Sequence, residues 1–412
     1  MKYITFIPLI GGMAIANEKA AGKKPEFVLS YDAFAKNESN LKNYWPDVEW
    51  HLLDADTNQL KDNIELDYSD IDFVSSVCPC AGMSMMSSSH SADSETNNWL
   101  YKAADYILGT IRPKVYFGEN APGLYSPANE KVANKLRAFG KKYGYSFTIY
   151  KTDTRLHGIP QRRVRTFFFF WKGDYCPIME YYNNPSEKPF EEWILDKNVG
   201  THNEISKRNP LNEYAAFKYI YTTKCNSDYS EYIKFFNNIN KEHRLTIALD
   251  YICVHNEWPQ FIEWLKNDEL GNKSLSATGK RTHLSLAEYR WNKLQQGLRF
   301  YSDEPILYFG YTGAVTGKIV SLMLHPKEMR YLTQREAMSL MGLPEDFEVS
   351  SGNIAHITQN VPVCTARDMT EQVIKFINGE LEMSKFEFVK QDNLKQRIDT
   401  AEFFQPELKF EE

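Results

Sequence analysis

The sequence predicts an α/β fold: a doubly wound, Rossmann-like sheet with a second, smaller mixed domain. From Met1 to about Lys172, short apolar runs alternate with amphipathic segments, as in parallel strands linked by helices. Near Gly173 this rhythm stops and the chain becomes rich in Tyr, Trp, Asn and Lys. The total of 412 residues also exceeds the size of one ordinary domain.

The expected strands of the first part have short apolar sequences bounded by turn residues. They are Tyr3–Pro8, Glu26–Ser30, Glu49–Leu53, Ile71–Val77, Pro113–Gly118, Tyr145–Tyr150 and Val164–Trp171. The expected helices are Met13–Ala21, Ala33–Tyr44, Asn98–Ile111 and Ala128–Tyr143. The last strand is apolar almost throughout, which indicates a strand covered on both faces.

The region after Gly173 has no βα rhythm, and its predicted helices are Glu231–Asn240, Asn256–Lys266 and Ser285–Leu298. Its small, basic stretch 272–283 is either a solvated surface loop or a loop that contacts a nucleic-acid backbone. Regular pattern returns with Thr333 and Glu336, which are spaced as a capping box at the start of a helix.

Another helix is expected over Thr365–Ile377. We interpret the charged tail from Gly379 as an appended helix or a partly disordered segment.

The composition, 42% hydrophobic residues with a mean hydropathy of −0.50, is typical of a soluble globular protein. A net charge of −6 argues against a generally basic nucleic-acid coat but allows a local basic groove. Six scattered cysteines without zinc-site spacing favour reduced thiols and no metal. The N-terminus resembles a weak signal peptide, but Gly11 and Gly12 interrupt it and favour a strand, a turn and a helix. No other stretch is long and apolar enough to cross a membrane. Because reduced thiols indicate a reducing compartment, we expect a cytoplasmic protein.

Cys80 follows Pro79 at the end of the strand Ile71–Val77 and precedes a small, polar segment. Ligands of open α/β sheets bind at the carboxyl ends of the strands, so a cysteine there is well placed for chemistry. On this stretch alone, an inert buried thiol is the commoner alternative.

Glu119 ends another apolar strand and precedes Asn120. If the two strands are neighbours, Glu119 lies near Cys80 among Phe and Tyr side chains, where burial would raise the pKa of the carboxyl group. Such a group could donate a proton near neutral pH. The alternative is a loop-capping role.

Arg163 and Arg165 enter the Phe-rich strand, where alternate side chains point the same way. Two guanidiniums at a strand end could hold a phosphate or a carbonyl oxygen. They would also favour the thiolate of a nearby cysteine.

These segments together resemble the DNA (cytosine-5) methyltransferase family. The resemblance rests on five motifs in order: Pro79-Cys80, Glu119-Asn120, Gln161-x-Arg163-x-Arg165, Arg330 to Pro344, and Gln359 to Pro362. It implies that Cys80 attacks C6 of a flipped cytosine, that Glu119 holds and protonates N3, and that Arg163 and Arg165 grip the nucleotide. The segment 81–95 would close as a lid, and Cys78 would be a packed thiol.

The resemblance also implies S-adenosylmethionine, or a close analogue, as cofactor. The family's first motif is altered, because Thr5 replaces its acidic residue, Ile7 its adenine-facing aromatic and Leu9 one glycine. The cofactor-binding residues expected from the motif and from the strand ends are Ile7, Gly11, Gly12, Asp32, Asp54 and Asn360.

We therefore expect a monomeric DNA cytosine-5 methyltransferase that acts on double-stranded DNA. Its predicted parts are 1–172 (catalytic and cofactor-binding), 173–328 (target recognition), 329–378 (C-terminal motifs returning to the catalytic domain) and 379–412 (charged tail). Three alternatives remain open: transfer of a group other than methyl from a modified cofactor, methylation of RNA, and a non-catalytic DNA-binding homologue. An insert as long as 173–326 favours DNA over RNA.

Overall fold

A computed structural model describes residues 1–62, 64–78, 93–197, 258–267, 282, 284, 285, 288, 289, 292, 308, 310–328, 330–349 and 354–400. The chain divides into two compact units: Met1–Glu187 with Met338–Glu412, and Lys188–Ala337. Each unit is described here by itself. The predicted helix Glu231–Asn240 and residues 272–281 of the basic stretch lie outside the described residues.

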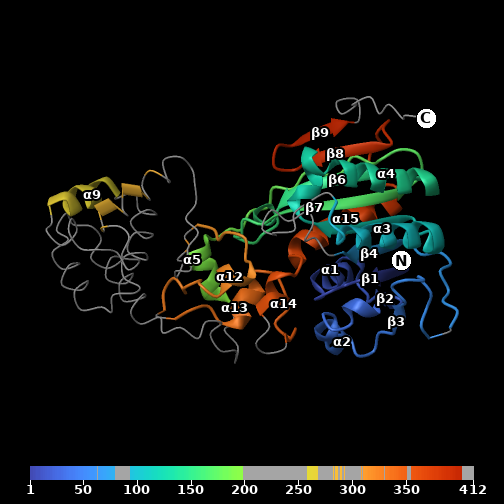
Figure 1. Cartoon of the computed structure of the whole chain (residues 1–412), viewed down its shortest axis with the longest axis horizontal. Coiled ribbons are helices and arrows are strands. Elements are labelled where there is room, and N and C mark those ends of the chain that lie inside the picture. The colour runs from blue at the N-terminus through green and yellow to red at the C-terminus, as the bar shows by residue number, and fades with distance from the viewer. Residues whose placement is uncertain are drawn as a thin grey trace. The chain divides into compact units, whose positions relative to one another are not determined.

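The first unit is organised around a sheet of nine strands in the order β3-β2-β1-β4-β5-β7-β6-β8-β9, which Figure 1 shows from β3 (blue) to β9 (red). The strands are β1 (Tyr3–Phe6), β2 (Val28–Tyr31), β3 (Trp50–Leu53), β4 (Phe73–Val77), β5 (Val115–Asn120), β6 (Tyr145–Asp153), β7 (Val164–Lys172), β8 (Phe388–Asp392) and β9 (Arg397–Thr400). All seven strands expected in the first part are present, and the α/β prediction is confirmed.

Strand direction differs from the parallel sheet that the sequence suggested. Strands β3, β2, β1, β4 and β5 are parallel, but β7 is antiparallel to both of its neighbours, β5 and β6. Residues 154–163 join β6 to β7 without a crossover helix. A short connection of this kind favours antiparallel strands, because a parallel pair needs a longer crossover.

Helices cover both faces of the sheet. On one face, α1 (Gly12–Ala21) packs against α15 (Val363–Ile377), and Asn17 bonds to Ser75 of β4 and to Thr370. On the other face lie α3 (Asn97–Tyr106), the π-helix η3 (Ile107–Ile111) and α4 (Glu130–Tyr143), whose apolar side chains join one hydrophobic cluster with those of β1, β4, β5 and β7.

Shorter elements complete the first unit. They are η1 (Asp32–Phe34), α2 (Ser39–Tyr44), η4 (Pro122–Tyr125), η5 (Pro127–Asn129), η6 (Thr154–Leu156) and α14 (Ile354–Thr358).

The tail is where the sequence prediction is wrong. Instead of a helix or a disordered segment, residues 388–400 form β8 and β9, which extend the sheet beyond β6. The polar residues Lys390 and Asp392 of β8 are buried and ion-paired, to Glu130 and Lys151. Because charged side chains occupy buried positions, the segment does not show the alternation of a strand.

The second unit contains α5 (Phe190–Trp193), η7 (Ile194–Asp196), α9 (Trp258–Asn267), α12 (Gly317–Val320) and the start of α13 (Gln334–Ser339). The capping box at α13 is confirmed: Thr333 N donates to Glu336 at 2.9 Å, and Glu336 N donates to the Thr333 hydroxyl at 3.2 Å. Within the part of the chain that the structure describes, no helix is long and apolar enough to span a membrane.

Candidate active site

The carboxyl ends of β1, β4 and β5 lie side by side at one edge of the sheet. Val77, the last residue of β4, is in register with Glu119 of β5. The backbone N–H of Val77 donates to the carbonyl of Ile7, in the turn that follows β1, at 3.1 Å. The sheet therefore brings together the two segments in which the sequence placed the cofactor turn and the catalytic carboxyl group.

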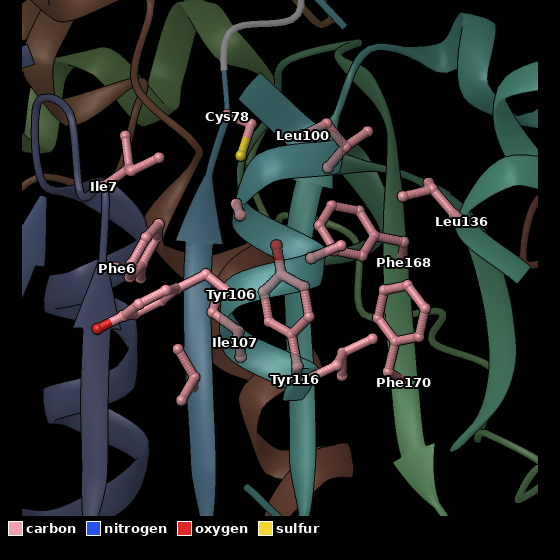
Figure 2. Packing of buried hydrophobic residues seen from close by; sticks show 14 of the residues in the cluster. Phe6, Ile7, Cys78, Leu100, Tyr106, Ile107, Tyr116, Leu136, Phe168 and Phe170 are labelled. Carbon is pink, nitrogen blue, oxygen red and sulfur yellow. The ribbon is translucent and has the colours of Figure 1, made fainter. Parts of the chain in front are cut away.

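Cys80 lies outside the described residues, as do Pro79 and positions 81–92 of the expected lid. The described chain ends at Cys78, one residue beyond β4. Figure 2 shows the Cys78 sulfur among buried side chains of the hydrophobic cluster, and burial raises the pKa of this thiol to about 12. A buried thiol that stays protonated is a poor nucleophile, which agrees with a packing role for Cys78.

Glu119 is 5% exposed and pairs with Arg165 of the neighbouring strand β7, with 2.7 Å between Arg165 Nε and Glu119 Oε1. Burial raises the pKa of Glu119, whereas the positive charges of Arg165 and Arg163 act against this shift. The carboxyl group is thus held in one orientation and favours its proton more than an exposed glutamate does. This is the property expected of a group that donates a proton near neutral pH.

Arg163 lies just before β7, is 3% exposed, and is directed toward the C-terminal segment. Its Nη2 donates to the carbonyls of Thr358 at 2.8 Å and Asn360 at 3.1 Å. Its charge also acts on Glu119. Both arginines therefore lower the pKa of Glu119. Arg163 also holds Thr358 and Asn360, which lie 195 and 197 residues further along the chain.

The turn after β1 has an unusual backbone. Ile7 and Leu9 have φ values of 46° and 49°, and Gly11 has a φ of 116°. The left-handed region is uncommon for residues other than glycine, and a β-branched residue there is a clear outlier. Such conformations persist only where the surrounding structure enforces them, and they gather at functional sites.

Gly12 and Asn360 join the turn to the C-terminal segment. The backbone N–H of Gly12 donates to Asn360 Oδ1 at 2.7 Å, and Asn360 Nδ2 donates to the carbonyl of His356 at 2.8 Å. A Cβ atom on Gly12 would lie 2.2 Å from the Val361 carbonyl oxygen, so glycine is required there. Gly12 and Asn360 are 348 residues apart in the sequence, so their contact can be seen only in the folded structure.

Asp32 and Asp54 follow β2 and β3, but each is engaged locally. Asp32 forms an ion pair with Lys61. Asp54 Oδ1 accepts hydrogen bonds from the backbone N–H groups of Asp56 and Thr57 and from the Thr57 hydroxyl, and these bonds lower the pKa of Asp54. Lys61 acts electrostatically on both carboxylates, and the sequence reading missed it.

Glu38 is a second residue that the sequence reading missed. It is 2% exposed, and the Ser30 hydroxyl donates to its Oε1. Burial raises the pKa of Glu38 to about 8. Its polar sequence context indicates an exposed side chain, so no signal in the sequence reveals the burial.

A family model for C-5 cytosine-specific DNA methylase matches residues 1–375. The type II methyltransferase M.AgeI of Thalassovita gelatinovora is 27% identical over 115 residues, which are 28% of this chain and 26% of that protein. M.NgoPII of Neisseria gonorrhoeae, also a type II methyltransferase, is 27% identical over 183 residues, which are 42% of this chain and 49% of that protein. The matched regions thus span half or less of either relative.

Among solved structures, a prophage-encoded E. coli protein assigned as a DNA modification methyltransferase has a TM-score of 0.53 at 13% identity. The match covers 92% of this chain and 99% of that one. At this identity, the likeness concerns the fold.

Proposed function

The chain belongs to the C-5 cytosine-specific DNA methylase family, and from this premise we propose that it transfers a methyl group from S-adenosylmethionine to C5 of a cytosine in double-stranded DNA. One observation carries the proposal. Glu119, buried and paired with Arg165, lies beside the end of the strand that leads to Cys80.

In the proposed reaction, the Cys80 thiolate forms a bond to C6 of the cytosine. Glu119 donates a proton to N3, which lets the ring accept the electron pair and makes C5 nucleophilic. Transfer of the methyl group to C5 would leave S-adenosylhomocysteine. Loss of the C5 proton to water then re-forms the C5–C6 double bond and expels the Cys80 thiolate, and N3 returns its proton to Glu119. Arg165 holds the carboxyl group of Glu119 in place, and the base must leave the duplex to reach this edge of the sheet.

The residues at the cofactor turn fit S-adenosylmethionine. The Val361 carbonyl and the Asn360 side-chain amide pack directly against Gly12, so this part of the turn presents its own backbone and no side chain of Gly12 to a ligand. Asp32 and Asp54 follow the next two strands, where carboxylates can accept hydrogen bonds from ribose hydroxyls and from an adenine amino group. When bound, this cofactor supplies an electrophilic methyl group on a sulfonium sulfur. Ile7, Gly11, Gly12 and Asn360 would hold it beside β4.

We further assign target recognition to residues 173–328 and expect a monomer. A compact second unit, Lys188–Ala337, supports a separate reading domain. A protein that reads one short duplex site needs side chains that reach the base edges, and a domain of this extent can supply them.

A covalent trap tests the proposal. Duplex DNA containing 5-fluorocytosine, incubated with the protein and S-adenosylmethionine, should give an adduct that survives denaturant, because fluorine cannot leave C5 as a proton does. Cys80→Ser should give none, and Cys78→Ser should still give the adduct. Trapping by Cys80→Ser, or failure of the wild type on every cytosine-containing duplex, would overturn the mechanism.

A further inference from the structure

Glu38 is a buried carboxyl group that contacts the turn after β1. It lies immediately before α2 and is 2% exposed. Ser30 of β2 donates its hydroxyl hydrogen bond to Oε1, and the backbone N–H of Leu9 is directed at the same carboxyl group. Glu38 Oε2 is buried and has no hydrogen-bond partner among the described residues. The catalytic steps proposed above do not use this side chain.

The position of Leu9 explains what the carboxyl group does for the turn. Leu9 has a left-handed backbone, where the family has a glycine, and an L side chain is disfavoured in that conformation. Other residues hold both ends of the turn: Ile7 N donates to the Leu29 carbonyl at 2.9 Å, and Gly12 N donates to Asn360. Between these two points, the N–H of Leu9 acts on the Glu38 carboxyl group and lowers its pKa. Glu38 therefore supports the strained part of the turn.

Charge links this support to the cofactor. A buried carboxyl group with one oxygen unpartnered is more stable with its proton, which raises the pKa of Glu38 to about 8. S-adenosylmethionine carries a positive sulfonium, and an opposite charge nearby favours the ionised form of a carboxyl group. Binding at the turn should thus draw the proton away from Glu38.

Two other charged or titratable groups face this region. The positive charge of Lys42, on the helix α2 that follows Glu38, lowers the pKa of Glu38. His356 of α14 bonds to Asn40 of α2, with 2.8 Å between Asn40 Nδ2 and His356 Nδ1, and burial lowers the pKa of His356 below its ordinary value. Because His356 loses its proton below the range in which Glu38 titrates, the two groups can be separated by pH.

We propose that Glu38 is a positioning residue of the cofactor turn, and that it releases its proton when a sulfonium cofactor binds. The inference rests on the proposed function, from which it takes the cofactor. Glu38 lies outside the family motifs, and release of its proton would be coupled to cofactor binding.

The experiment is calorimetric titration of the DNA-free protein between about pH 6.5 and about pH 8.5. The ligands are S-adenosylmethionine and S-adenosylhomocysteine, which has no sulfonium charge. The proteins are the wild type, Glu38→Gln, and Glu26→Gln as a matched control whose side chain pairs with Lys23 at the surface. Because the α-amino group of the ligand also titrates near pH 8, the comparison between proteins carries the test.

The wild type and Glu26→Gln should bind S-adenosylmethionine at least about fivefold more tightly at the upper pH than at the lower, since one linked proton changes affinity up to about tenfold per pH unit. S-adenosylhomocysteine should show a smaller change. In Glu38→Gln, the affinities for the two ligands should change with pH to the same extent. If the affinity of Glu38→Gln for S-adenosylmethionine depends on pH as in the wild type, the inference about Glu38 is wrong, but the proposed cofactor is still supported. If the wild type binds neither ligand at any pH, both the cofactor and the inference fail.

Ser30→Ala provides an independent check that does not remove the carboxyl group. The hydrogen bond from Ser30 lowers the pKa of Glu38, so its loss should move the midpoint of the pH profile upward. An unchanged midpoint would contradict the inference even if Glu38→Gln failed to fold.

Discussion

Two neighbouring regions of the first unit differ in how well they match the family motifs. One is the catalytic edge, which holds Glu119 and Arg165, and the other is the cofactor turn, residues 7–12. At the catalytic edge, where β5 ends and β7 begins, Glu119 and Arg165 follow the family motifs in sequence, and the structure adds an ion pair between them. At the turn, Thr5, Ile7 and Leu9 all depart from the motif, yet the turn still lies beside the end of β4.

The difference follows from whether side-chain atoms or backbone atoms form the site. In the proposed reaction a carboxyl and a guanidinium side chain act directly at this edge, so a change of residue type there would remove the chemistry. At the turn the backbone makes the shape, and side chains far away in the sequence can hold it. Asn360 fixes Gly12, and Glu38 supports Leu9. A motif can therefore change where backbone shape is what counts.

The largest effect is expected at the catalytic edge. Glu119→Gln should lower the rate of methyl transfer at saturating cofactor by about 10²–10⁴-fold, because the amide cannot donate the proton to N3. Cofactor affinity should stay unchanged, as measured by calorimetry. Glu26→Gln serves as the exposed control. A rate within threefold of wild type, on the order of experimental scatter, would mean that Glu119 is not the proton donor.

Gly12→Ala should break the turn. The new Cβ would collide with the Val361 carbonyl, and overpacking of this kind costs about 1–3 kcal/mol. Cofactor binding should weaken at least about tenfold, since each 1.4 kcal/mol corresponds to a factor of about ten. Gly379→Ala is the control: φ is 75° there, so the backbone is strained too, but the new Cβ meets no atom within 4 Å and cofactor binding should stay intact. Normal binding by Gly12→Ala would show that the turn does not depend on backbone shape.

Arg163 belongs to both regions, so it tests whether they are separate. Arg163→Lys should weaken cofactor binding without DNA, because a lysine cannot make both bonds to Thr358 and Asn360. Losing one such buried bond costs about 1–3 kcal/mol. The exposed Arg162→Lys is the control. If affinity for the cofactor is unchanged and only the affinity for DNA falls, Arg163 acts on the nucleotide alone.

The pH dependence of stability tests the turn without a ligand. The pKa of Glu38 is about 8 in the folded protein and about 4.3 when unfolded, so the folded state binds the proton more strongly. Its contribution is complete below the unfolded pKa and is lost as pH rises toward 8, at up to about 1.4 kcal/mol per unit. Urea unfolding at several pH values should show this fall in the wild type and a flatter profile in Glu38→Gln. Equal profiles would remove Glu38 from the account.

The smallest effect is expected from Lys61→Ala. This change frees Asp32 from its exposed ion pair, and such pairs contribute little. Cofactor affinity should change only slightly, and in the direction of tighter binding if the ribose hydroxyls compete with Lys61 for Asp32. A large loss of affinity, measured by the same calorimetry, would give Lys61 a direct role at the site.

The sequence predicts the strands of the first part and the candidate site residues at their ends. Both predictions are possible because apolar runs and turn residues are local signals. The sequence also predicts the capping box of Thr333 and Glu336, which involves two residues of one turn. The direction of β7 was missed because alternation of apolar residues does not encode it. Strands β8 and β9 were missed because Lys390 and Asp392 are buried as ion pairs.

At the site, the limit is again distance along the chain. Glu119 lies near the end of β5 and Arg165 near the start of β7, so they meet only because β7 is antiparallel to β5, which the sequence pattern does not encode. The contacts of Arg163 with Thr358, and of Gly12 with Asn360, join segments that share no local pattern. Glu38 becomes buried only because α2 and β2 enclose it, which its polar neighbours in the sequence do not indicate.

Methylation of C5 of cytosine in DNA by this chain can be measured directly. Duplex DNA is incubated with the protein and methyl-labelled S-adenosylmethionine, digested to nucleosides and analysed by mass spectrometry. We predict labelled 5-methylcytosine with the wild type and none with Cys80→Ser. DNA that stays unmodified, or label on another base, would contradict cytosine-5 methylation by this chain.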